Sequence, residues 1–174
     1  MKYKFQFTAS LAGLLALLTI TFSWATEARA PKRARYIVRD LGTLPGGMTS
    51  YAFDMNDAGW VAGSSTLTPD GAYQHSVLWH DQHVTDLGTL GGPNSEAGGP
   101  NASLEAPLIA ETSQADPNGE DFCGFGTHLQ CLAAVWRPDS NQPLSGTITA
   151  LALLPGGNNS QAYGVNNRSE VVGF

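Results

Sequence analysis

The chain has 174 residues, of which 42% are hydrophobic and 14% charged, and its formal net charge is −6. From Asp40 onward only Arg137 and Arg168 are basic against fourteen acidic residues, so no basic stripe is available to bind nucleic acid. The composition therefore predicts no nucleic-acid partner.

The N-terminal segment predicts export. Lys2 and Lys4 precede an apolar run over residues 5–24, and the small residue Ala25 follows. This order is typical of a secretory signal, so we expect a signal peptide over residues 1–25 and a short basic leader over 26–35. An uncleaved membrane anchor is the alternative, because the run is just long enough to span a bilayer. No later stretch has that length. The expected location is secreted or extracellular, and the periplasm and the cell surface are alternative locations.

The rest of the chain repeats itself. D-L-G-T-L-P-G-G-M-T-S-Y-A at Asp40 returns as D-L-G-T-L-G-G-P-N-S-E-A at Asp86 and as L-L-P-G-G-N-N-S-Q-A at Leu153. A self-similar period indicates tandem supersecondary units that bury their apolar faces against each other. The predicted organisation is a first repeat with a preceding strand over 36–85, a second repeat with insertions over 86–149, and a partial third repeat over 150–174.

Each full repeat predicts four short strands. In the first copy they are residues 51–55, 60–65, 75–79 and 83–87, separated by turn sequences such as N-D-A-G at 56–59. Four antiparallel strands in about 46 residues match one β-propeller blade, and a solenoid of the same unit is the alternative. The predicted fold class is all-β: tandem four-stranded antiparallel repeats that form a partial, open or truncated β-propeller.

Several residues recur at equivalent places and are expected to have structural roles. Glycine pairs open each copy and would let the chain cross between sheets through positive φ. Bulky aromatic residues would pack as wedges between neighbouring sheets. The glycines are Gly46, Gly47, Gly91, Gly92, Gly156 and Gly157, and the wedges are Trp79, Trp136, Phe53 and Tyr163.

The strand count predicts an incomplete ring. Tyr36 to Leu41 matches the fourth strand of a repeat, two full copies follow, and the third copy has only its first two strands. Closed propellers use roughly four to eight blades. We therefore expect either a piece of a longer repeat protein or a chain that self-associates to cover its open sheets.

The motifs resemble the HAF repeat of predicted extracellular bacterial proteins. The D-L-G-T-L-G-G opening, the S-x-A-x-x-x-N segment and the H-x-x-L-W strand at His75, Leu78 and Trp79 carry the likeness. Ser76 and Val77 depart from the family's H-A-F-L-W strand. The resemblance implies a secreted, propeller-like repeat protein. It implies no catalytic residues, because no activity defines that family.

One insertion of the second copy holds the candidate chemistry. Cys123 and Cys131, two cysteines in an exported chain, are expected to pair and contribute about 2–3 kcal/mol. The alternatives are a reduced pair or a metal site with His128, although this spacing matches no common zinc pattern. Beside them, Asp116, Glu120 and Asp121 surround a glycine turn and are a Ca²⁺ candidate, with a solvated acidic loop as the alternative. No cofactor is otherwise expected.

The histidines of the first repeat are a second place where a metal could bind. His75, His80 and His83 lie close together in sequence, but alternation along a strand separates His75 from His80. Surface histidines at a hairpin are the favoured interpretation.

The leading functional hypothesis is an extracellular binding or scaffolding module whose ligand, a glycan or a protein, is unknown. The alternative is a carbohydrate-active lyase or hydrolase of the cell envelope that uses carboxylates in the inserted loops. A non-enzymatic role is favoured because no nucleophile elbow, phosphate loop or H-E-x-x-H motif is present.

Overall fold

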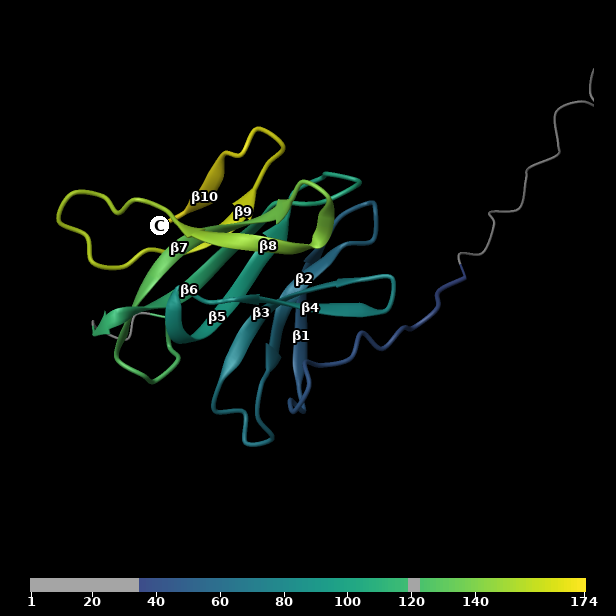
Figure 1. Ribbon diagram of the computed structural model, residues 1–174, viewed down its shortest axis with the longest axis horizontal. Helices are drawn as coiled ribbons and strands as arrows, with labels where there is room; N and C mark the ends of the chain where they lie inside the picture. The colour runs from purple at the N-terminus through teal and green to yellow at the C-terminus, as the bar shows by residue number, and fades with distance from the viewer. Residues whose placement is uncertain (1–34, 119–122) are drawn as a thin grey trace, which may run out of the picture. The chain divides into compact units, whose positions relative to one another are not determined.

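The structure is a computed structural model that describes residues 35–118 and 123–174. All secondary structure in this part of the chain is β. Sheet A contains, in spatial order, β1 (Ser50–Met55), β2 (Val61–Thr66), β3 (Gln74–His80) and β4 (His83–Gly88) (Figure 1). Consecutive strands pair antiparallel.

Two further sheets follow along the chain. Sheet B contains β5 (Gly91–Pro100), β6 (Ile109–Asn118), β7 (Leu129–Asp139) and β8 (Gln142–Ala150), again antiparallel and in sequence order. Sheet C contains β9 (Ala162–Val165) and β10 (Val171–Gly173). The prediction of an all-β fold with four-stranded antiparallel sheets is confirmed.

The strands of the first copy begin and end within one or two residues of their predicted bounds. The strand expected at Tyr36 to Leu41 does not form, and residues 35–49 contain no strand. Tyr36, Ile37 and Val38 are 90% or more exposed. In sheets A and B, the fourth strand of the repeat is stabilised by pairing with the third strand. Residues 36–41 have no such pairing with a described strand.

One asparagine shapes the first hairpin of each copy. The Oδ1 of Asn56 accepts hydrogen bonds from the amides of Ala58 and Trp60, at 3.0 and 3.1 Å. Asn101 and Asn166 accept two following amides in the same way. Asparagine favours such turns because its side chain satisfies backbone donors locally.

The largest core cluster lies between sheets A and B. Ala62 and Leu78 of sheet A, with Trp60 just before β2, meet Ile109 and Trp136 of sheet B, and all five are at most 2% exposed. Burial of each large side chain contributes about 1.5–3 kcal/mol. A smaller cluster around Ala110, Ala133 and Ala162 joins sheets B and C. A third cluster covers the other face of sheet A.

The aromatic wedges divide into two groups. Trp136 packs between sheets A and B, and Trp79 packs with Leu44 and Val77 on the other face of sheet A. Phe53 and Tyr163, which the sequence placed as wedges, are instead 50% and 54% exposed. Each lies where the register of its hairpin shifts, and a bulged residue leaves the regular alternation of buried and exposed side chains.

The glycine pairs have two different roles. Gly46, Gly91 and Gly156 have φ angles of 91°, 110° and 82°, which side chains disfavour. The second glycine of the first pair provides close approach, because a Cβ at Gly47 would collide with the carbonyl oxygen of Thr66. The pairs thus turn the chain into the first strand of each copy.

Candidate functional site

The inserted segment of sheet B contains the predicted disulfide. Cys123 and Cys131 are bonded, with their Cα atoms 6.2 Å apart, which confirms the predicted pair. Cys131 is fully buried on β7, so the bond ties the segment that follows β6 to the centre of the sheet.

The acidic part of the same segment lies largely outside the described residues. Glu120 and Asp121 are not described, and neither is the side chain of Asp116 near the end of β6. The Ca²⁺ hypothesis therefore stays a prediction. In the described part of the chain, no three His, Cys, Asp or Glu side chains gather in a way that could hold a metal ion.

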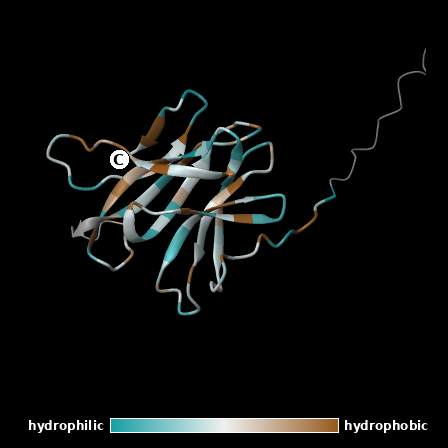
Figure 2. Ribbon diagram, viewed as in Figure 1, coloured by the Kyte–Doolittle hydropathy of each residue, from teal (hydrophilic) through white to brown (hydrophobic). Residues whose placement is uncertain are grey.

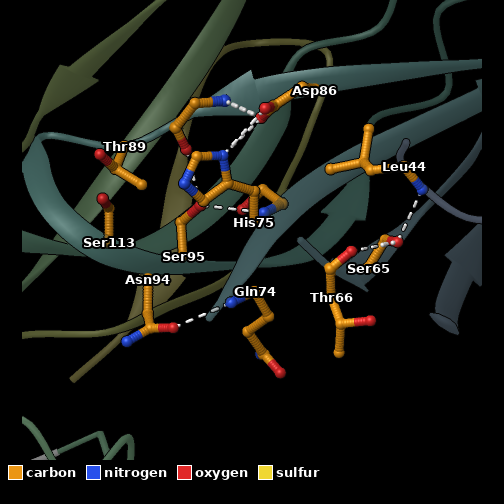
Figure 3. Close-up of polar contacts among 12 residues, drawn as sticks. Leu44, Ser65, Thr66, Gln74, His75, Asp86, Thr89, Asn94, Ser95 and Ser113 are labelled. Carbon is orange, nitrogen blue, oxygen red and sulfur yellow. Dashed lines mark hydrogen bonds and ion pairs between the residues drawn. The ribbon is translucent and has the colours of Figure 1, made fainter. Parts of the chain in front are cut away.

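An asparagine–serine pair fastens each sheet to the one before it. Asn94 and Ser95 accept hydrogen bonds from the backbone amides of Gln74 and Ser76 of β3, both at 2.9 Å (Figure 3). The Ser95 hydroxyl donates in turn to the carbonyl oxygen of Gly88 at 2.6 Å. These contacts cross from sheet B to sheet A, and both side chains are at most 2% exposed.

The third copy repeats this arrangement on sheet B. Asn159 and Ser160 accept hydrogen bonds from the amides of Cys131 and Ala133 of β7, again at 2.9 Å. We call each pair an Asn–Ser clasp. This role was not predicted, although the N-S dipeptide after each of the last two glycine pairs is its signal in the sequence.

A buried carboxyl group lies at the joint between sheets A and B. Glu111 of β6 is fully buried, and its carboxylate interacts with the equally buried hydroxyl of Ser76 without a hydrogen bond of regular geometry. The equivalent positions of the other copies are the glycines of V-A-G at Gly63 and V-V-G at Gly173. Only the second copy places an acid here.

Burial raises the pKa of Glu111 well above its ordinary value, because the charged form loses its hydration. The negative charge of Asp86 raises it further, and the nearby Ser76 hydroxyl offsets a part. Burial therefore favours the protonated form of Glu111.

Two other carboxyl groups lie nearer the surface. Burial raises the pKa of Asp86, but the hydrogen bonds with the His75 ring at 2.8 Å and with the Gly88 amide outweigh this and lower it overall. Burial also raises the pKa of Glu96, partly offset by the hydrogen bond from Gln74. Asp86 is thus hydrogen-bonded to His75 and Gly88, and Glu96 is hydrogen-bonded to Gln74.

The histidines have separate environments. His75 binds Asp86, whereas the ring of His80 stacks on Trp60 with centroids 3.7 Å apart. His83 contacts the backbone of Asp81 at the β3–β4 turn. Among the described residues, the three histidine side chains do not converge on one point.

One pocket of the described part of the chain has a volume of about 390 Å³. It lies beside sheet C and is lined by apolar residues that include Leu151, Leu154 and Val171, with the clasp residues Asn159 and Ser160 at its polar side. A second pocket of about 260 Å³ lies over β1 at Ala52, Phe53 and Met55.

The fold and the joints define an all-β protein of four-stranded antiparallel sheets joined in tandem. A comparison of the sequence with protein-family models gave no match, and comparisons with curated proteins and with solved structures gave none either. In the described residues, no helix is long and apolar enough to cross a membrane.

Proposed function

We propose that this chain is an extracellular binding or scaffolding module built as an open, propeller-like arc of β-repeats. The observation that carries the proposal is the repeated Asn–Ser clasp, which joins sheet B to sheet A and sheet C to sheet B with the same two amide contacts. The resemblance to the HAF repeat supports export and the propeller-like arrangement.

The buried polar groups favour a structural role over catalysis. Asn94, Ser95 and Gln114 bind one another or the backbone of a neighbouring sheet. A framework of this kind holds its loops in fixed positions, and loops on rigid scaffolds are where binding residues concentrate.

The loops of the second copy are the proposed contact surface. Residues 101–108 connect β5 to β6, and the segment after β6 is tied to β7 by the disulfide. A disulfide restricts the conformations of the segment that it closes, so less conformational entropy is lost when such a segment binds. The proposed ligand is an extracellular glycan or protein.

Binding would be tested with the purified chain on a glycan array and on a panel of extracellular proteins, with a reducing-sugar assay run in parallel. We expect binding without turnover. Replacement of residues 119–122 by a Gly-Ser linker should reduce binding, whereas replacement of Ser140-Asn141 at the β7–β8 turn by Gly-Gly should not. Release of reducing sugar would instead support a hydrolase, and equal binding by both variants would remove the inserted loop from the proposal.

Export would be tested by mass spectrometry of the chain from a secreting bacterial host. We expect a mature N-terminus at Thr26, because Ala25 fits the position before a signal-peptidase cut. A full-length N-terminus retained in the membrane fraction would contradict export with signal removal.

A further inference from the structure

A small pocket lies at the joint between sheets B and C. Its volume is about 40 Å³, and its lining comes from β5, β6, β9 and the segment that follows β6. One water molecule needs about 10–15 Å³ of such space, so the pocket admits a group of about three heavy atoms. It is too small to enclose a sugar ring, but it can take the tip of a side chain.

One glycine brings sheets B and C close together beside this pocket. Gly98 of β5 occupies the copy position of Phe53 and Tyr163, so the second copy has no aromatic ring there. A Cβ at Gly98 would lie 2.4 Å from the carbonyl oxygen of Tyr163, so the backbones of β5 and β9 approach closely. The inserted segment contributes Cys123 and Phe125 to the lining.

Glu96 supplies the carboxyl group of the pocket. Figure 2 shows hydrophilic segments within the strands as well as in the loops, and Glu96 is a half-buried polar residue of β5. Burial raises its pKa, and the hydrogen bond from Gln74 at 3.2 Å offsets only a part. In the described part of the chain, no basic side chain forms a salt bridge with it. Within these residues, positive charge therefore does not offset the desolvation of the carboxylate.

The other polar groups of the lining present oxygen acceptors. The amide oxygen of Gln161 accepts a hydrogen bond from the Tyr163 hydroxyl at 2.6 Å, and the Thr112 hydroxyl accepts one from the Ala162 amide at 3.3 Å. Each of these oxygens has a second lone pair. Phe125 and Tyr163 add aromatic rings, which attract cations. A carboxylate, further acceptor oxygens and aromatic rings together suit an ammonium group.

The charge of the surrounding chain favours a cationic ligand. From Asp40 onward the chain has only two basic residues against fourteen acidic ones, so its field attracts cations. A lysine side chain carries a compact ammonium group with three donors on a flexible stem. The planar guanidinium group of arginine has more heavy atoms and fits a pocket of this volume less well.

We propose that the pocket between sheets B and C binds the ammonium group of a lysine side chain on a partner protein. This inference rests on the proposed binding function, and it chooses a protein over a glycan as the partner. The inserted segment of the second copy, which Cys123 ties to β7, is part of the same surface. Glu96 supplies the negative charge, and Gln161 and Thr112 supply the further acceptors.

The experiment titrates two capped peptides into the isotope-labelled full chain and follows the backbone amides by NMR. One peptide is acetyl-Gly-Ser-Lys-Ser-Gly-amide, and the other carries an acetylated lysine, which keeps the stem but loses the positive charge. We expect saturable millimolar binding of the first peptide, with shifts at the amides of residues 96–98 and 161–163, and about tenfold weaker binding of the second. Equal affinities, or no shifts at these amides at about 20 mM peptide, would overturn the proposal.

Two protein variants locate the contact. Glu96→Gln removes the charge with little change of shape and should weaken binding of the lysine peptide about tenfold. Glu105→Gln is the matched control, at an exposed glutamate in the β5–β6 connection outside the pocket, and should leave binding unchanged. The same affinity in both variants would show that Glu96 does not hold the ammonium group.

A sugar titration and the arrays separate this inference from the proposed function. Shifts at the pocket amides with N-acetylglucosamine, but none with the lysine peptide, would assign the pocket to a glycan and overturn the lysine site. Array binding that depends on residues 119–122, without any response to the lysine peptide, would also overturn the lysine site but leave the proposed function in place.

Discussion

At the scale of single residues, the polar groups of the joints divide into those with partners and those without. Ser95 both accepts from Ser76 and donates to Gly88 while fully buried, so it satisfies two backbone groups of another sheet. Ser50, at the equivalent place in the first copy, makes only a partly exposed contact with the Gly42 carbonyl at 2.9 Å. Ser95 is therefore expected to contribute more to the free energy of unfolding than Ser50 does.

We expect Ser95→Ala to lower the free energy of unfolding by about 1–3 kcal/mol, because it leaves buried backbone groups without partners. Ser50→Ala is the matched control and should change it by less than about 0.5 kcal/mol. Urea denaturation of the two variants beside the parent chain measures the difference. Equal effects at both positions would show that the clasp contributes nothing to the joint.

Glu111 makes the stability of the folded chain depend on pH, and the direction of this dependence follows from its raised pKa. Because its pKa is raised in the folded chain, the group favours folding below the unfolded value of about 4.5 and loses that contribution as the pH rises toward the folded value. Glu96 has a shift of the same sign. The pKa of Asp86 is lowered instead, so its contribution to stability is present at neutral pH and is lost only as the pH falls below about 3.8.

Glu111→Gln should flatten the fall in stability above pH 4.5, because the amide imitates the neutral carboxyl at every pH. Melting temperatures from pH 4 to pH 9 measure this, with Glu96→Gln as the comparison for a less buried acid. The parent and the variant should agree near pH 4 and diverge as the pH rises. Parallel curves would contradict a raised pKa at Glu111.

At the scale of elements, the hairpins could be read from the sequence almost residue by residue. The N-D-A-G turn predicts the β1–β2 hairpin because Asn56 satisfies the turn amides through its own side chain. The segment at Tyr36 to Leu41 shows the limit of such local inference. Its pattern matches β4, but residues 35–49 contain no strand in the structure, because a strand forms only with a pairing partner.

The disulfide belongs to this scale because it joins an irregular segment to β7. Replacement of both Cys123 and Cys131 by serine should cost about 2–3 kcal/mol of stability, since the unfolded chain regains the entropy of an open loop. Chemical denaturation measures the loss, and thiol titration of the denatured parent should find no free thiol. Two titratable thiols in the exported protein would contradict the bond.

At the scale of the whole molecule, equivalent faces of the sheets differ in what covers them. Ala97 and Ala162 are each 1% exposed because the preceding sheet packs on them, while Ala52 of the first copy is exposed beside Phe53 and Met55. On sheet C, Val172 is 66% exposed. Since sheets A and B, and then B and C, pack in the same order, these surfaces suit head-to-tail docking of a second copy.

We expect the purified chain to self-associate at micromolar concentration, as measured by sedimentation velocity. Phe53→Asp and Val172→Asp should each weaken association by about tenfold or more, and Tyr73→Asp, in the β2–β3 loop, should not. A mixture of the first two variants should recover a 1:1 complex, because each retains one intact surface. A compact monomer at all concentrations, or no recovery in the mixture, would contradict head-to-tail docking.

The sequence by itself determined the all-β class, the position of the hairpins and the disulfide pair, because turns, strand alternation and a short cysteine loop are properties of neighbouring residues. Only the tertiary structure decided that Asn94 and Ser95 hold sheet A, that Glu111 is enclosed beside Ser76, and that Phe53 and Tyr163 are exposed. These outcomes depend on which sheet packs on which face and on where a bulge shifts the register. Contacts between residues far apart in the chain set both, and no local pattern records them.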